Sequence, residues 1–120
     1  MSEESQIVVP ESFIALYRVP GGSGRLSAPR AQIAERYEFC EDLATMLTEQ
    51  AANRRWELGV SEDDVLERIH EGLLGMDSGV DAAEAAWVLR RLAELLDWRA
   101  SRFHPEASNA PTPTGRPGRA

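Results

Sequence analysis

The chain has 120 residues, which is room for one domain with a modest core, and it carries a formal net charge of −7. An acidic body repels phosphate backbones, so we expect no nucleic-acid partner. All 13 basic residues are arginines, which excludes a Schiff-base lysine and the lysine of a nucleotide-binding P-loop.

The acidic charge is concentrated between Leu26 and Trp98, where 16 acidic side chains outnumber 7 basic ones. The single cysteine, Cys40, excludes an intramolecular disulfide. The first residues lack the basic and apolar regions of a signal peptide. No apolar run approaches the roughly 18 residues that a membrane span needs. We therefore expect a cytoplasmic protein that makes no membrane contact.

The first 27 residues predict one short ordered piece. Residues 1–6 are polar and are expected to be disordered. Pro10 and Ser12 introduce the apolar run Phe13–Tyr17, which fits one or two helical turns. Proline and glycine are frequent in residues 19–27, so this stretch is predicted to be a flexible loop.

A long helix is predicted from just after Ser27 to about Glu57, with Pro29 in its first turn and Gly59 as its stop signal. Its apolar residues recur at spacings of four and three, which places them on one stripe. The stripe consists of Ile33, Tyr37, Cys40, Ala44, Leu47 and Ala51, widened by Phe39, Leu43 and Met46. Together they cover roughly half the circumference, so this helix is expected to contact two neighbours.

Two shorter helices begin with the same capping pattern. Ser61 and Asp81 occupy N-cap positions, and an acidic residue follows each three residues later, Glu84 in the second case. The second of these helices is predicted to continue to about Arg99. Their expected core positions are Val65, Leu66, Ile69 and Leu73 in one, and Ala85, Val88, Leu89, Leu92, Leu95 and Leu96 in the other. The short connection at 75–79 favours antiparallel packing of the two.

These patterns predict an all-α fold: a three-helix bundle with a short N-terminal segment packed on it and a disordered C-terminal tail. Residues 1–6 are assigned to a disordered N-terminus and residues 7–103 to a single helical domain. Residues 104–120, rich in proline, glycine and arginine, are assigned to a disordered tail.

No residue pattern points to catalysis. Cys40 lies in the apolar stripe, where it is expected to pack as a small hydrophobe, and His104 falls in the predicted tail. Glu67 and His70 match half of a di-iron motif, but the second half is missing. The glycine-rich residues 21–25 lack the strand and the lysine of a phosphate-binding loop. We therefore expect no enzymatic activity, no cofactor and no bound metal.

Two rows of acidic side chains form faces rather than a pocket. One lies on the long helix opposite its stripe, and the other follows the next helix at i,i+4 spacing. The rows are Glu35, Glu38, Asp42 and Glu49, and Asp63, Glu67 and Glu71. A solvated surface and a docking face for a basic partner both fit them.

Two tryptophans suggest an interaction surface. Trp87 and Trp98 are about 20° apart on the last helix, on a side that the predicted helix seam does not use. Arg91 and Glu94 lie between them. Tryptophan and arginine dominate binding hot spots, so these four residues form a candidate surface for another protein or for a second copy. In the alternative interpretation, Phe13–Tyr17 folds over the two indoles and covers them.

Three stretches carry a resemblance to known proteins: PESFIALYR at 10–18, APRAQIAERYEFCEDLATMLTEQA at 28–51 and WELGVSEDDVLERIHEGLL at 56–74. Together they resemble a family of small uncharacterised proteobacterial proteins, members of which are sometimes labelled "ATPase with chaperone activity". The resemblance brings no residue roles. The chain also departs from the label because it has no Walker A lysine and is too short for an ATPase domain.

We therefore expect a non-enzymatic protein–protein interaction module, such as an adaptor or a chaperone-associated accessory protein. The partner is expected to be another protein or a second copy. The alternative that the resemblance implies is a small nucleotide-binding protein or an ATPase-linked chaperone factor.

Overall fold

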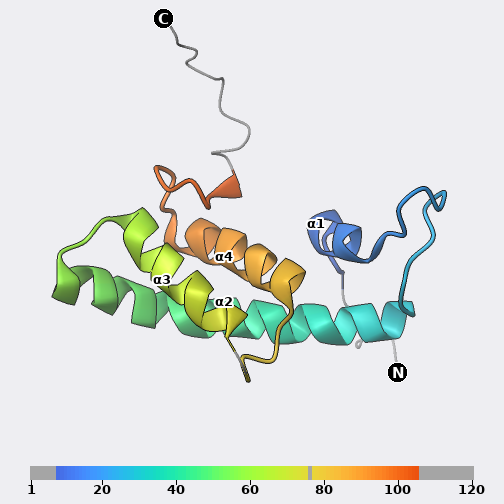
Figure 1. Ribbon diagram of the computed structural model, residues 1–120, viewed down its shortest axis with the longest axis horizontal. Helices are drawn as coiled ribbons and strands as arrows, with labels where there is room; N and C mark the ends of the chain where they lie inside the picture. Colours follow the sequence, from blue (N-terminus) through green and yellow to red (C-terminus); the bar gives the residue numbers. More distant parts are fainter. Residues whose placement is uncertain (1–7, 76, 106–120) are drawn as a thin grey trace, which may run out of the picture.

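The computed structural model describes residues 8–75 and 77–105, and these residues are mostly helical. In chain order the elements are α1 (Glu11–Ile14), the 3-10 turn η2 (Ala15–Tyr17), α2 (Arg30–Leu58), α3 (Glu62–Leu74) and α4 (Ala82–Leu96) (Figure 1). The described residues contain no β-strand, only an isolated antiparallel bridge between Arg18 and Leu26 at the base of the glycine-rich loop. The predicted all-α class is confirmed for this part of the chain.

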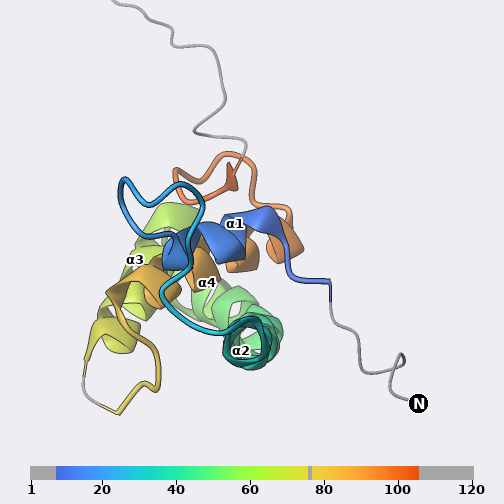
Figure 2. The same cartoon turned by 90° about the vertical axis from the view of Figure 1, so that its right-hand side faces the viewer.

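Helix α2 is the axis on which the other helices pack, and α1, α3 and α4 all lie along one side of it (Figures 1 and 2). Pro29 is its N-cap, so the proline stands one position before the helix rather than inside its first turn. Gly59 ends the helix in the left-handed conformation at φ 65°, and its N–H donates to the carbonyl of Arg55. The predicted stop is therefore confirmed.

The buried face of α2 is narrower than the sequence predicts. The central stripe is buried apart from Tyr37, which is half-buried, but Phe39 and Met46 are 41% and 67% exposed. Small side chains at Cys40 and Ala44 let the neighbouring helices lie close to α2. Phe39 and Met46, on the flanks of the stripe, are left partly in solvent.

Both predicted caps form. The Ser61 hydroxyl accepts the backbone N–H of Asp64, and Asp81 and Glu84 make a reciprocal capping box. Helix α4 ends at Leu96, about three residues earlier than predicted, because Asp97 adopts the left-handed conformation at φ 57°. Leu95, which was assigned to the core, is 38% exposed on its last turn.

Helix α1 closes the top of the core, where it lies against α2 and α4 (Figure 2). Its Phe13 is fully buried. The other buried apolar residues are Ile33, Cys40, Ala44, Leu47, Ala51, Val65, Leu66, Leu73, Ala85, Trp87, Val88, Leu89, Leu92 and Ala93. The N-terminal segment thus contributes to the same core as the three long helices.

The chain after α4 folds back onto α3. The carboxylate of Asp63 accepts hydrogen bonds from the Ser101 hydroxyl at 2.7 Å and from the backbone N–H of Arg102 at 2.9 Å. Ser101 and His104 are buried in this turn, so the assignment of His104 to a disordered tail is wrong. The expected disorder of residues 1–6 and 106–120 lies outside the described residues. No described helix is both long and apolar enough to cross a bilayer.

Candidate functional site

Trp87, the first of the four candidate surface residues, is buried. Its indole is 6% exposed and donates from Nε1 to the Ser12 hydroxyl at 2.9 Å. The ring packs edge-on against Phe13, with 5.1 Å between centroids, and against Tyr37 at 5.8 Å. For Trp87, therefore, the covering interpretation is the correct one: α1 lies over the indole and satisfies its donor.

Arg91 and Glu94 form a charged cluster beside Trp87. The Arg91 guanidinium donates to both carboxylate oxygens of Glu41 on α2, at 2.8 to 3.1 Å, and to Glu94 at 3.0 Å. These hydrogen bonds raise the pKa of Arg91 above its ordinary value. A bidentate pair of this kind joins α4 to α2. Each of the three guanidinium nitrogens of Arg91 donates a hydrogen bond within the fold, so Arg91 has a structural role.

Trp98 lies apart from these three residues. Since α4 ends at Leu96, the helical spacing that was expected to align Trp98 with Trp87 does not extend to it. Its indole instead faces the end of α2, where the Arg55 guanidinium lies 5.8 Å from the ring centroid. The structure thus separates the predicted surface into a buried indole, a charged cluster and a second indole elsewhere.

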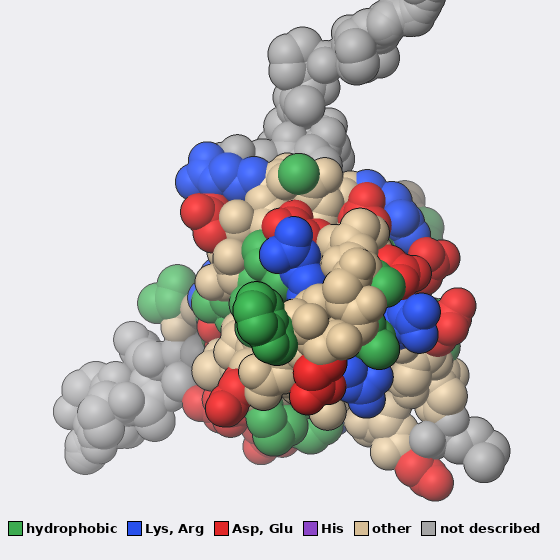
Figure 3. Space-filling view, turned by 90° about the vertical axis from the view of Figure 1, so that its left-hand side faces the viewer, with side chains coloured by type: hydrophobic (Ala, Val, Ile, Leu, Met, Phe, Trp, Pro, Cys, Tyr) green, Lys and Arg blue, Asp and Glu red, His purple; other side chains and the backbone are tan. Residues whose placement is uncertain are grey.

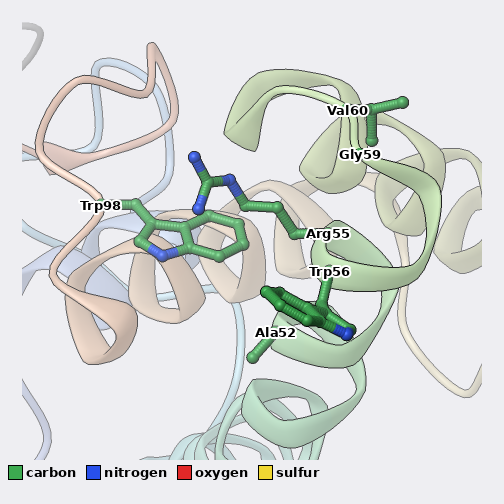
Figure 4. A pocket seen from close by; sticks show the side chains of 6 residues that line it. All are labelled: Ala52, Arg55, Trp56, Gly59, Val60 and Trp98. Atoms are coloured by element: carbon green, nitrogen blue, oxygen red, sulfur yellow. The ribbon is translucent and has the colours of Figure 1, made fainter.

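The second indole belongs to a different surface, which we call the Trp56–Trp98 pocket. It is an open hollow of about 500 Å³ at the C-terminal end of α2. Its lining consists of Ala52, Arg55, Trp56, Gly59, Val60 and Trp98. Figure 4 shows the Arg55 side chain reaching toward the Trp98 indole, with the Trp56 ring standing beside Ala52 on the nearer side. Trp56 is 86% exposed.

This pocket forms at one end of the molecule. Figure 3 views that end and shows hydrophobic side chains at the surface next to arginine and acidic side chains. Sequence reasoning overlooked Trp56, although a signal was available. The apolar stripe of α2 would continue through positions 54, 55 and 58, so a tryptophan at position 56 falls on the outer side of the helix.

A buried polar network surrounds Glu84 in the first turn of α4. Glu84 accepts the Tyr17 hydroxyl at 3.0 Å and two hydrogen bonds from the Arg36 guanidinium at 2.7 and 2.9 Å. Burial raises the pKa of Glu84, but the hydrogen bonds from Arg36, the Asp81 backbone and Tyr17 outweigh it and hold the pKa below its ordinary value. The network joins η2, α2 and α4 through the Glu84 carboxylate.

Cys40 is buried in the core, and His70 lies against Phe103. Burial raises the pKa of the Cys40 thiol to about 12, so the thiol stays protonated at neutral pH and is a poor nucleophile. The ring of His70 faces Phe103 at 6.1 Å, and the neighbouring Glu67 contacts Arg102 at 3.5 Å. Among residues 8–75 and 77–105, no three His, Cys, Asp or Glu side chains are grouped to hold a metal ion.

The acidic rows have different surroundings. The row on α2 is exposed along its length, at Glu35, Glu38, Asp42 and Glu49. The negative charge of the row on α3 is partly neutralised, because the Arg102 guanidinium contacts the carboxylates of Asp63 and Glu67. Asp63 also accepts the backbone N–H of Arg102. Only the first row therefore remains as an open acidic face.

No family model, curated protein or solved structure matches the chain.

Proposed function

We propose that the protein is a non-enzymatic interaction module that binds another protein through the Trp56–Trp98 pocket. In this proposal the three long helices act as a bundle that holds the pocket in place, as a cytoplasmic adaptor or chaperone-associated accessory protein requires. The exposure of Trp56, at 86%, is the observation that supports it most directly. Burying an indole gives a large favourable free energy, which an exposed indole does not gain. Binding of a partner over Trp56 would supply it.

The neighbours of Trp56 add to the argument. Arg55 and Trp98 are residue types that concentrate in binding hot spots, and they meet Trp56 at one hollow. Arg55 also complements the dipole at the C-terminal end of α2, which gives it a structural use. Trp56 has no comparable use, since its indole Nε1 has no hydrogen-bond partner among the described residues. Binding of a partner would explain why Arg55, Trp56 and Trp98 meet at this surface.

The test is capture of a partner from an extract of the source organism by the immobilised full chain. Trp56→Ala should reduce capture by tenfold or more, which is roughly the effect of losing one hot-spot residue. Its melting temperature should stay at the wild-type value, because the side chain is exposed. Met46→Ala provides the control, since Met46 is 67% exposed on the same helix away from the pocket. Equal capture by wild type and Trp56→Ala would refute the proposal.

Two other outcomes would redirect it. If light scattering gives the mass of a dimer and Trp56→Ala restores the monomer, the pocket binds a second copy of the chain. If millimolar ATP raises the melting temperature of the pure protein, the nucleotide-binding alternative gains support, because a ligand that binds the native state stabilises it.

A further inference from the structure

A second hollow lies between α2 and α3, on the side of α2 away from Trp56. It encloses about 250 Å³. Its apolar lining is Leu47, Val65, Ile69 and Leu73, and its remaining lining is Gln50, Arg54, Arg68 and Gly72. We call it the α2–α3 groove. The two helices thus form a small apolar floor, in which Ile69 is half-buried and the other three apolar side chains are buried, with a guanidinium on each helix.

Gly72 in this groove is not explained by the fold of the chain itself. It lies in the last turn of α3, where glycine is a poorer helix former than alanine. A Cβ added to Gly72 would meet no atom within 4 Å, and its φ lies outside the left-handed region. Neither close packing nor backbone conformation therefore requires glycine here. Because glycine has no side chain, it leaves one side of the groove open to an approaching polypeptide.

The charges around the groove indicate what would approach. Within the described part of the chain, Arg54 has no carboxylate within 4 Å. Arg68 has one contact, at 3.3 Å, to Asp64 one turn earlier on α3, and both side chains are largely exposed. Exposed pairs of this kind are weak and exchange readily for a better acceptor. In a chain of net charge −7, two available guanidinia beside apolar side chains form a local site for anions.

We propose that the α2–α3 groove binds an amphipathic helix of a partner protein, with aliphatic side chains on the floor and Asp or Glu side chains on Arg54 and Arg68. Grooves between two helices commonly receive a third helix in this way. The site shares no residue with the Trp56–Trp98 pocket. The inference therefore goes beyond the proposed function and does not depend on it.

The first test is an NMR titration of the isotopically labelled full chain. The probe is a synthetic helical peptide of about four turns with leucine on one face and glutamate on its flanks. We expect shifts of the Gln50 and Gly72 amides and of the Nε signals of Arg54 and Arg68. A matched peptide with lysine in place of glutamate should bind about tenfold more weakly, because it meets guanidinium groups of like charge.

The second test separates binding from stability. Gly72→Ala should raise the melting temperature by about 2 °C, since alanine favours the helix and meets no neighbour. The same substitution should weaken binding of the acidic peptide by about tenfold, because it narrows the groove. Leu74→Ala, at a 52% exposed and uncharged α3 position outside the groove lining, is the control and should leave the affinity unchanged. A residue with only a structural role would not move stability and affinity in opposite directions.

Several results would overturn the inference. Two of these are equal binding of the acidic and basic peptides and unchanged peptide affinity in Gly72→Ala. A third is a set of NMR shifts in the groove that depend on protein concentration without peptide, which would assign the groove to a second copy of the chain. Peptide shifts confined to the Trp56–Trp98 pocket would also overturn it while leaving the proposed function standing. Conversely, Trp56→Ala should not change the affinity of the groove for the acidic peptide.

Discussion

The three tryptophans occupy three different environments. Trp87 is covered by α1, Trp98 is half-buried against Arg55, and Trp56 stands in solvent. Acrylamide quenching of fluorescence measures this difference directly. We expect Trp56→Phe to remove most of the readily quenched emission and Trp87→Phe to remove the protected emission. A protected Trp56 would contradict the exposure on which the proposed function depends.

Glu84 is the buried charge on which the polar network depends. Glu84→Gln leaves the Arg36 guanidinium without its carboxylate, and Arg36 is itself 32% exposed in its side chain. Loss of one partner from a fully buried pair costs about 3–5 kcal/mol, and solvent access at Arg36 reduces this to about 2 kcal/mol of unfolding free energy. Urea denaturation at neutral pH measures the loss. Glu35→Gln, on the exposed row of α2, is the control and should change little.

The same carboxylate gives an acid dependence. Because the folded pKa of Glu84 lies below its ordinary 4.5, its contribution is present above that pH and is lost as the pH falls through the folded value. The unfolding free energy of the wild type should therefore decline more steeply below about pH 4.5 than that of Glu84→Gln. Parallel acid profiles for the two proteins would count against the network.

Tyr17 gives a dependence on alkaline pH. Burial, and then the hydrogen bond and charge of Glu84, raise its pKa from 10.0 to about 12. A raised folded pKa contributes stability below pH 10 that is lost as the pH rises toward 12. Tyr17→Phe should cost about 1 kcal/mol at neutral pH for the lost hydrogen bond. Urea denaturation should also show a smaller loss of unfolding free energy at alkaline pH in Tyr17→Phe than in the wild type. The rest of that loss is expected from Cys40 and Tyr37, whose pKa values are also raised.

Among the α-helices, α1 is the shortest, and its packing depends on a single buried side chain. Phe13 is fully buried and contacts the rings of Tyr17, Tyr37 and Trp87. Phe13→Ala should lower the unfolding free energy by about 3–5 kcal/mol, as for other buried aromatic side chains. It should also make Trp87 accessible to acrylamide while most of the helical circular dichroism remains. Val8→Ala, at an 88% exposed position, is the control.

The ends of α2 and the caps of α3 and α4 could be predicted because the signals are local. Pro29, Gly59, Ser61 and the Asp81–Glu84 box each act on backbone groups within a few residues. The end of α4 could not be placed, because it depends on a left-handed aspartate at position 97. Helical periodicity alone gives no sign of such a break, and the position assigned to Trp98 was wrong for that reason.

Long-range contacts account for the other differences. The hydrogen bond from Ser101 to Asp63 joins residues 38 positions apart, and no pattern near either residue predicts it. Phe39 and Met46 lie on the flanks of a stripe whose width is set by how closely the neighbouring helices approach. Trp87 is buried although helix geometry placed it off the seam, because α1 covers it. Trp56 stays exposed, as its position on the outer side of α2 indicates.

At the scale of the whole molecule, α2 is the common support. It contacts α1 through Tyr37, α4 through the Arg91–Glu41 and Arg36–Glu84 pairs, and α3 through the floor of the α2–α3 groove. The loop before α4 is also tied to it, since Arg36 donates to the carbonyl of Gly79 at 2.6 Å. Helices α1, α3 and α4 are thus each fixed to α2.

The length of α2 makes it a spacer between the two ends of the molecule. Its 29 residues extend for about 43 Å at 1.5 Å per residue, without a proline between Arg30 and Leu58 to bend it. Spin labels on Gln32→Cys and Asn53→Cys, both exposed, should give one narrow distance distribution near 32 Å between backbone positions. Buried Cys40 should remain unlabelled in the native protein. A broad or double distribution would mean that the rod bends, whereas a narrow one means that whatever α2 carries at its two ends is held at a constant spacing.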